Sequence, residues 1–258
     1  MSHDISELLR EWKYETQEVT VRMIDGDDGR PKVQLRLDLG SLQMEVDGRP
    51  DGERPEGCES WLEYYVEKQR VHEATYSDTL PFELTDVDCH RLWQEGVQYY
   101  HRYLSFWHLS RYALCARDTQ RNLRLFTFTK QYARGQRNKW QFDQFRPYVT
   151  MMHARGVAMP LVEKGDYREA LRVIDAGVEA IRDFLDEYRL SARGEECAEL
   201  ASLEQWRNEV RKAAEESLDS DAARTVAHLR LKLQEAVAEE RFEEAAALRD
   251  QIRKLSPG

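Results

Sequence analysis

The hydrophobic pattern of this chain changes its period once, near residue 57, and that change limits the folds available to it. In the first part, apolar and polar residues alternate over 19–23, 33–39 and 42–46. Alternation with a period of two is typical of half-buried β-strands. From Glu59 onward, apolar residues recur every three or four positions, as they do in amphipathic helices. Strands at one end and helices along the rest indicate an α+β fold that is mainly α.

The three alternating segments predict a small antiparallel β meander. Gly26 and Gly29 supply a turn between the first two segments, and Gly40-Ser41 makes a two-residue turn before the third. The apolar face of such a sheet cannot stand exposed to water, so we expect the helix around 61–66 to cover it. The acidic loop at 47–57 is expected to be a solvated connector. The expected apolar face consists of Val33, Leu35, Leu37 and Leu39 opposite Val19 and Val21.

Helical periodicity, broken by Gly and Pro, predicts a helical body after the meander. A long aromatic helix is expected from 86 to about 114, begun by a capping box of Thr85 and Asp88. Asp118 is expected to begin the next helix as its N-cap. The segment LFTFT at 125–129 alternates like a strand within that stretch.

Two further helices are predicted at about 148–164 and 167–184. The spacing of small and aromatic residues in this pair resembles one tetratricopeptide repeat. A second unit 34 residues upstream is missing, so a repeat array is not indicated. The positions that carry the resemblance are Ala158, Leu161, Gly165, Tyr167 and Ala170.

The C-terminal segment carries two apolar stripes with helical spacing. Polar residues at 239–241 separate the stripes, and neither Gly nor Pro lies at the junction. Two short helices joined so tightly fold back as an antiparallel hairpin. Such a hairpin buries too little surface to be stable alone, so it must pack on its own chain, on a copy of itself or on a partner. The first stripe contains Val226, Leu229, Leu233, Ala236 and Val237, and the second contains Phe242, Ala245, Leu248, Ile252 and Leu255.

The sequence FEEAAALRDQI, with Leu233 and Val237 before it, resembles the UVR motif. That motif occurs in the excision-repair proteins UvrB and UvrC and in the stress proteins McsA and ClpC. The resemblance implies that the hairpin mediates protein–protein contact. Phe242 lies at the helix junction, where one large ring can touch both helices, so we expect it to be the wedge between them. It covers only the C-terminal end, and the chain has no GxxxxGK[ST] phosphate loop. The partner-binding residues that it implies are Leu233, Val237, Phe242, Ala245, Ala246, Arg249, Asp250 and Ile252.

Charge is unevenly distributed along the chain, whose net charge is −10. Residues 1–88 carry 22 acidic and 10 basic residues, and 157–258 carry 23 and 16, whereas 89–156 carry only 3 acidic and 12 basic. Cations beside aromatic rings can bind single-stranded nucleic acid. The same cations can pair with the acidic ends of the chain, and a pI near 5.3 argues against strong nonspecific DNA binding. The alternative nucleic-acid site comprises Lys130, Arg134, Arg137, Lys139, Trp140 and Arg146.

Motifs for catalysis and for metal binding are absent from the sequence. It contains no nucleophile elbow, GxGxxG or HExxH, and its four cysteines form no CxxC. Widely spaced cysteines are typical of free thiols in a reducing compartment. The chain has no apolar run of about 18 residues, and its N-terminus lacks the apolar core of a signal peptide. We therefore expect a cytoplasmic protein that is not an enzyme, holds no cofactor or metal and does not enter a membrane.

Together these patterns predict a noncatalytic adaptor that docks a partner protein through its C-terminal hairpin, in DNA repair or protein quality control. The alternative is a nucleic-acid-binding accessory protein of excision repair that uses the basic middle segment. The expected divisions are 1–56 for an N-terminal helix and the meander, 57–214 for the helical body, 215–223 for a polar linker, and 224–258 for the hairpin.

Overall fold

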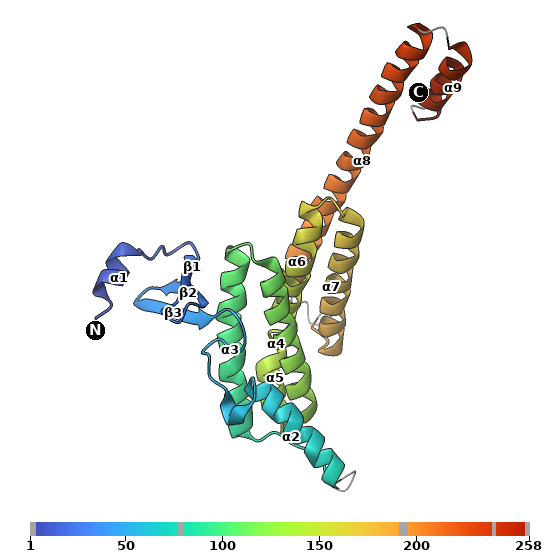
Figure 1. Ribbon diagram of the computed structural model, residues 1–258. Coiled ribbons are helices and arrows are strands. Elements are labelled where there is room, and N and C mark those ends of the chain that lie inside the picture. The colour runs from blue at the N-terminus through green and yellow to red at the C-terminus, as the bar shows by residue number, and fades with distance from the viewer. Residues whose placement is uncertain (1–3, 77–79, 191–195, 239–240, 256–258) are drawn as a thin grey trace.

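The computed structural model describes residues 4–76, 80–190, 196–238 and 241–255, and from 219 onward it describes only part of the side chains. A small sheet lies at one side, a helical body lies in the middle, and a long helix carries a short one away from the body (Figure 1). The predicted class, α+β and mainly α, is confirmed. Among the described helices, none is both long enough and apolar enough to cross a membrane.

The three predicted strands form an antiparallel meander, as the alternation predicted. After a short helix α1 (Ser6–Glu11), the chain forms β1 (Val21–Asp25), β2 (Pro31–Leu37) and β3 (Gly40–Glu45). Strand β2 lies between the other two, so that Leu35 faces both Val21 and Leu42. Gly29, at a φ of 72°, makes the turn into β2 in a backbone region that favours glycine.

One face of the sheet is buried against helix α3 (Asp86–His108). The expectation that the helix around 61–66 covers the sheet was therefore wrong. Val33 and Leu35 are buried as expected, but Leu37 and Leu39 are exposed, since both lie at the far end of the hairpin. The other residues of the buried face are Met44 and Val46.

The opposite face of the sheet is polar and is also covered. The guanidinium of Arg36 donates from Nε to the backbone carbonyl of Trp12, 2.7 Å away. Arg22 lies 4.1 Å from the centre of the Trp12 ring and donates to Gln34, which is itself buried. The segment after α1 thus shields a row of polar side chains that would otherwise lie open to water.

Helices form the rest of the described chain. In sequence order α3 packs on α4, α4 on α6, α6 on α7, and α7 on the first part of α8. The capping box at the start of α3 is confirmed: Asp88 N–H donates to Thr85 Oγ1, and Thr85 N–H donates to Asp88 Oδ2. The bounds of the remaining elements are η1 (Pro55–Gly57), α2 (Trp61–Tyr76), α4 (Tyr112–Tyr132), α5 (Gln136–Asp143), α6 (Arg146–Glu163), α7 (Tyr167–Glu187), α8 (Ala198–Ala238) and α9 (Phe242–Leu255).

Two local expectations in the body were wrong. The alternating segment 125–129 lies inside α4, where Leu125 and Thr129 are both fully buried at a spacing of one helical turn. Asp118 lies inside α4 rather than at its N-terminus, because its carboxylate pairs with a buried arginine of α3. In both cases contacts from a neighbouring helix override the local pattern.

Helices α6 and α7 form the predicted hairpin, turned at Gly165 with a φ of 77°. Small residues bring the helices of the body close together. A Cβ at Gly177 of α7 would lie 2.8 Å from the Cβ of Ala154 on α6, closer than such atoms approach. Gly156 of α6 similarly lies against the backbone of Ala116 on α4. These close contacts determine which helices of the body lie next to each other.

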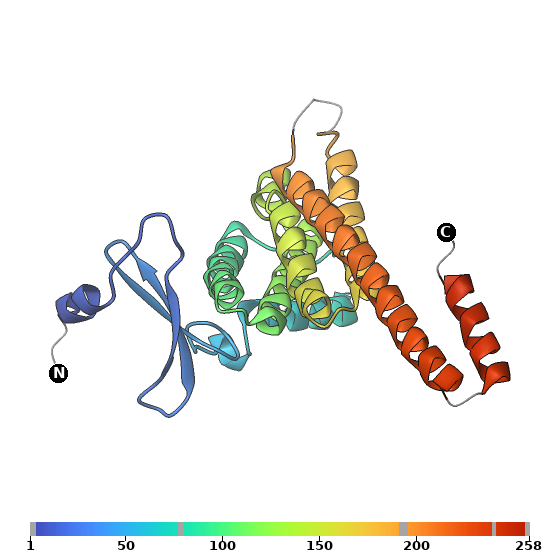
Figure 2. The same ribbon diagram turned by 90° about the horizontal axis from the view of Figure 1, so that it is seen from above.

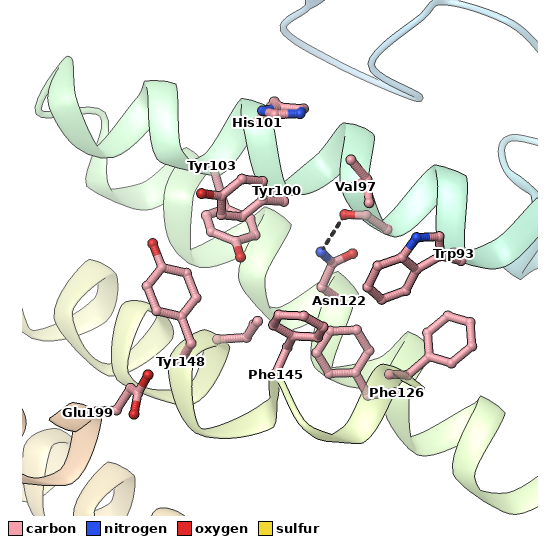
Figure 3. Close-up of a pocket in the computed structure, with 13 residues that line it drawn as sticks. Trp93, Val97, Tyr100, His101, Tyr103, Asn122, Phe126, Phe145, Tyr148 and Glu199 are labelled. Atoms are coloured by element: carbon pink, nitrogen blue, oxygen red, sulfur yellow. Dashed lines mark hydrogen bonds between the residues drawn. The ribbon is translucent and has the colours of Figure 1, made fainter. Parts of the chain in front are cut away.

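Helices α3, α4, α5 and α6 enclose a pocket of about 550 Å³, lined mainly by aromatic rings (Figure 3). Trp93 and Tyr100 of α3 lie on one wall, and Phe145 and Tyr148 lie on the facing wall. Many aromatics of the basic middle segment therefore face inward, although the pocket leaves some of their surface open.

A buried ion pair between α3 and α4 joins these two helices to the N-terminal sheet. Arg102 of α3 donates from Nε and Nη2 to the two carboxylate oxygens of Asp118 on α4, at 2.6 and 2.9 Å, and both side chains are only 1% exposed. The remaining nitrogen of Arg102 donates to the backbone carbonyls of Glu45 and Gly48, at 2.9 and 2.8 Å. The chain that leaves β3 is thereby fixed to the helical body.

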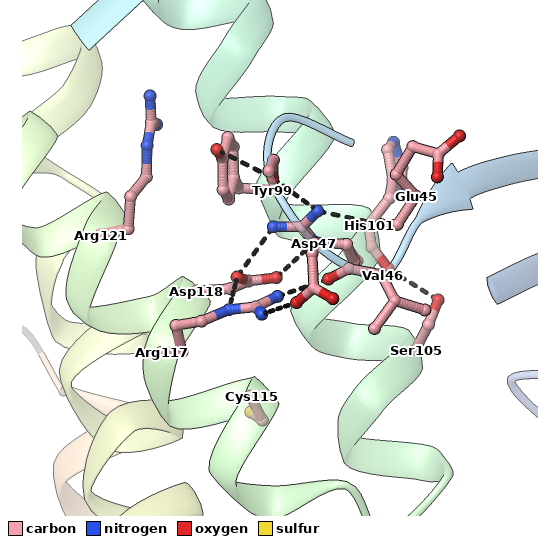
Figure 4. Close-up of polar contacts among 12 residues, drawn as sticks. Glu45, Val46, Asp47, Tyr99, His101, Ser105, Cys115, Arg117, Asp118 and Arg121 are labelled. Carbon is pink, nitrogen blue, oxygen red and sulfur yellow. Dashed lines mark hydrogen bonds and ion pairs between the residues drawn. The ribbon is translucent and has the colours of Figure 1, made fainter. Parts of the chain in front are cut away.

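A second arginine strengthens the same junction. Arg117 pairs with Asp118 and with Asp47, and it donates to the Val46 carbonyl at 2.6 Å (Figure 4). Farther along, Asp51 accepts a hydrogen bond from Gln98 of α3 at 2.8 Å. The start of the loop expected to be a solvated connector is therefore held against α3 and α4.

Glu95 of α3 fixes the start of α2. Its side chain is fully buried and accepts hydrogen bonds from the backbone N–H groups of Trp61 and Leu62, at 2.7 and 3.1 Å. Arg49 and Arg121 both pair with this carboxylate. A carboxylate at a helix N-terminus satisfies free N–H groups and interacts favourably with the helix dipole.

Substitution of Asp118 tests this junction. In Asp118→Asn the side chain keeps its shape but leaves the Arg102 guanidinium buried without a counter-charge. We expect the free energy of unfolding to fall by about 3–5 kcal/mol, the usual cost of breaking a buried pair from one side. Urea denaturation followed by circular dichroism measures the change.

The matched control is Glu67→Gln, which breaks an exposed pair with Arg70 on α2. It should change stability little, because exposed pairs contribute little. Equal stability of Asp118→Asn and the unaltered protein would show that the junction does not depend on the buried charges.

Candidate partner-binding hairpin

Helix α8 runs without interruption from Ala198 to Ala238, a length of 41 residues. The segment 215–223 was expected to be a polar linker, but it is helical and continuous with the residues on both sides. It contains neither Gly nor Pro, and its Glu and Ala residues favour the helix, so the chain has no reason to break there.

The two parts of α8 have different surroundings. In the first part, Leu203 and Val210 are buried against the helical body. The second part leaves the body and extends beyond it, where it contacts α9 (Figure 2). Leu218, between the two parts, is 69% exposed.

Helix α9 folds back along the end of α8 to form the predicted antiparallel hairpin. Leu248 of α9 is buried against Leu229 and Leu233 of α8. Val226, one turn before Leu229, is also buried. The apolar stripes read from the sequence therefore meet each other, and Leu233 contributes to the inside of the hairpin rather than to its outer surface.

The outer face of α9 is exposed and charged. Ala246 is exposed, and so are Arg249 and Asp250, which form an ion pair with each other at 2.9 Å. Ile252 is half-buried at the end of the helix. Of the residues expected to bind a partner, Arg249, Asp250 and Ala246 are therefore accessible in the isolated chain.

Three expected partner-binding residues lie outside the described side chains. Val237 falls at the end of α8, and Phe242 and Ala245 fall in the first turn of α9. The expectation that Phe242 is the wedge between the helices stays a prediction.

The basic middle segment is partly neutralised by acidic residues of the same chain. Arg146 donates to Asp143 at 2.9 Å and to Glu187 of α7 at 2.7 Å, and Lys130 also pairs with Glu187. Burial would raise the pKa of Glu187, but the hydrogen bonds from Lys130 and Arg146 outweigh it and lower the pKa below its ordinary value. These two cations therefore stabilise contacts between helices.

Other members of the basic set remain accessible. Arg134 and Arg137 are exposed, and among the described residues neither has an ion-pair partner. Lys139 is half-buried. Trp140 is 40% exposed and stacks at 16° against Phe184 of α7, with ring centres 6.4 Å apart. Of the six residues, Arg134 and Arg137 are therefore the two cations that are both exposed and without a described ion-pair partner.

The geometry defines an α+β protein that carries a helical hairpin on an extended arm. Residues 224–256 match the family model of the UvrB/UvrC motif, so this hairpin is a UVR motif. No curated protein and no solved structure matches the chain. The match begins in the second part of α8 and covers α9, and it does not reach the sheet or the helical body. UVR is an interaction motif, which supports a protein partner in general.

The sequence patterns did not predict two features of the body, the aromatic pocket and the buried ion pair. The pocket between α3 and α6 depends on which sides of four helices face one another, and residue spacing does not determine this. The Arg102–Asp118 pair left a weak signal, because Arg102 interrupts a stripe of tyrosines and Phe106 on one helix. A charged residue on such a face indicates a buried partner without identifying it.

Substitution of Leu248 tests how the hairpin is held. Leu248→Ala should remove about 2–5 kcal/mol of packing free energy. So small a cluster is not expected to supply enough stability to tolerate that loss. We expect the amides of 226–252 to lose hydrogen-exchange protection while those of α3 and α4 keep theirs. The control is Leu231→Ala on α8, the other helix of the hairpin, since Leu231 is 60% exposed. Unchanged protection of 226–252 in Leu248→Ala would mean that other contacts hold the hairpin.

Proposed function

We propose that this protein is a noncatalytic adaptor that docks a partner protein through its C-terminal hairpin. The observation that carries the proposal is the position of the UVR motif on a helix that leaves the body. Leu229, Leu233 and Leu248 pack together between α8 and α9, whereas Ala246, Arg249 and Asp250 of α9 are exposed. An interaction motif presented in this way is accessible to a partner without rearrangement of the body.

The docking face is proposed to be the outer side of α9, with Arg249 and Asp250 as polar contacts. Their side chains are 68% and 59% exposed, and their only described ion pair is with each other. Exchange of that pair for contacts with a partner loses little, because exposed ion pairs contribute little to stability. The other members of the proposed set are Leu233, Val237, Phe242, Ala245, Ala246 and Ile252.

The cellular setting follows from the occurrence of the motif. UVR motifs are found in excision-repair proteins and in stress proteins, so DNA repair and protein quality control in the cytoplasm are the proposed processes. The chain is proposed to act there by bringing its own body to the partner. The proposed functional units are the sheet and the body at 1–56 and 57–214, and the hairpin at 224–258, with 215–223 connecting them.

The docking test compares two double variants. Partner proteins are first captured from an extract of the source cell with full-length protein and with a 1–218 truncation, then purified and titrated. Arg249→Ala/Asp250→Ala should weaken binding about tenfold or more, since hydrogen bonds to charged groups contribute about 1.5–3 kcal/mol. The control, Glu169→Ala/Arg172→Ala, removes an equivalent exposed pair at 3.0 Å on α7.

Retention of the partner by the 1–218 truncation would contradict docking through the hairpin. Equal loss of binding in both double variants would point to an effect of the overall charge rather than to the face of α9.

The alternative function, nucleic-acid binding in excision repair, depends on Arg134, Arg137 and Lys139. We expect only weak binding of single-stranded DNA at about 150 mM salt, because few unpaired cations remain and the net charge is −10. Fluorescence anisotropy of a labelled oligonucleotide measures the affinity. Sub-micromolar binding that is lost in Arg134→Ala/Arg137→Ala/Lys139→Ala would promote the alternative. The same variant should leave partner docking unchanged.

A further inference from the structure

The pocket of about 550 Å³ between α3 and α6 has the size of a site for a small organic molecule. Its walls approach each other at two points: the Trp93 and Phe145 rings are 5.6 Å apart, and the Tyr100 and Tyr148 rings are 6.3 Å apart. Tyr100 is 36% exposed and Phe145 is 43% exposed. The pocket is therefore open to solvent at its rim.

The three tyrosine hydroxyls on the pocket lining, those of Tyr100, Tyr103 and Tyr148, make no hydrogen bond with a described residue. Tyr103 is only 1% exposed, and its side chain points from α3 into the pocket (Figure 3). Its hydroxyl makes no hydrogen bond with any described residue, and the pocket leaves the oxygen partly accessible. Burial raises the pKa of Tyr103, and it raises the pKa of Tyr148 to about 12, so both hydroxyls stay protonated at neutral pH.

The charge on the pocket lining is negative. Glu199, in the first turn of α8, lies beside Tyr148 and forms no ion pair with a described residue. Burial lowers the pKa of His101, which is therefore neutral at pH 7. The Asn122 amide is already used, since it donates to the Gly96 carbonyl at 3.0 Å and accepts from Arg121. Glu199 is thus the one acidic side chain on the described lining, which holds no Lys or Arg.

These groups are complementary to a cation with an apolar body. The faces of tyrosine rings attract an ammonium group, and the attraction grows when water is excluded. Tyr100 and Tyr103 meet edge to face at 89°, and Tyr148 faces them across the pocket, so three rings surround one end. Glu199 lies at that same end, whereas Trp93 and Phe145 line the other with apolar surface.

We propose that this pocket binds a small aromatic or aliphatic amine. The ammonium group lies among Tyr100, Tyr103 and Tyr148, donates a hydrogen bond to the free Tyr103 hydroxyl and is neutralised by Glu199. The apolar part of the amine packs along the Trp93 and Phe145 rings, which contact each other at that end of the pocket. Nothing about the UVR hairpin is needed for this site, so it is independent of the docking function.

The test uses three probes of nearly equal shape: phenethylamine, 2-phenylethanol and phenylacetate. Binding to the full-length protein is measured by calorimetry and by the change in total tryptophan fluorescence. We expect phenethylamine to bind at least about tenfold more tightly than the alcohol, and phenylacetate to bind most weakly. Equal binding of amine and alcohol, or no binding of the amine, would overturn the proposal.

Two substitutions test the contributions of the Glu199 carboxylate and the Tyr103 hydroxyl separately. Glu199→Gln and Tyr103→Phe should each weaken phenethylamine binding about tenfold, and Glu199→Gln should leave the alcohol unaffected. The control is Glu215→Gln, an exposed residue of the same helix. Urea denaturation of each variant confirms that the body is folded.

A peptide with a central lysine distinguishes a free amine from a protein side chain. Tighter binding of the peptide than of phenethylamine would identify the ligand as a lysine of another protein and would overturn the small-molecule assignment. Equal effects of Glu199→Gln and Glu215→Gln would also overturn it, because the binding would then follow net charge alone.

Discussion

The rest of the structure depends on the buried pair of Arg102 and Asp118. Two charged side chains, each only 1% exposed, are stable inside a protein only when nearly all their hydrogen-bonding groups are satisfied. Here the carboxylate takes two donors of Arg102, and the backbone carbonyls of Glu45 and Gly48 take the third nitrogen. The pair can be satisfied only when α3, α4 and the end of β3 are all in place. The packing of α3 on α4 therefore depends on the position of the sheet.

The same principle explains why the N-terminal meander is covered by α3. A three-stranded sheet has too small an apolar face to specify its own neighbour. Instead, Arg102 and Glu95 of α3 fix the sheet against that helix. Arg102 donates to the backbone carbonyls of Glu45 and Gly48, and Glu95 pairs with Arg49 in the segment that follows β3. Glu95 acts in the same way on the start of α2, where two N–H groups and two arginines meet one buried carboxylate.

Helix α8 connects the body to the interaction motif without a hinge. Over 41 residues, at about 1.5 Å per residue, it spans roughly 60 Å. Its first part is a core helix of the body, and its last part is one half of the UVR hairpin. A continuous helix restricts the orientations of the hairpin far more than a flexible linker would. A docked partner would consequently be held at a defined distance from the body. The first turn of the same helix also lines the pocket, through Glu199.

The sequence by itself determined the class of fold, the three-stranded meander, the capping box at Thr85 and the UVR hairpin. Each of these depends on residues that are close along the chain, so their period, turns and caps are visible without a structure. Only the tertiary structure decided that α3 covers the sheet, that 125–129 is helical, that Asp118 is a buried ion-pair partner and that 215–223 continues a helix. It also decided where the aromatic rings leave a pocket. These features arise from contacts between residues far apart in the chain, and such contacts outweigh local preferences of less than about 1 kcal/mol per residue.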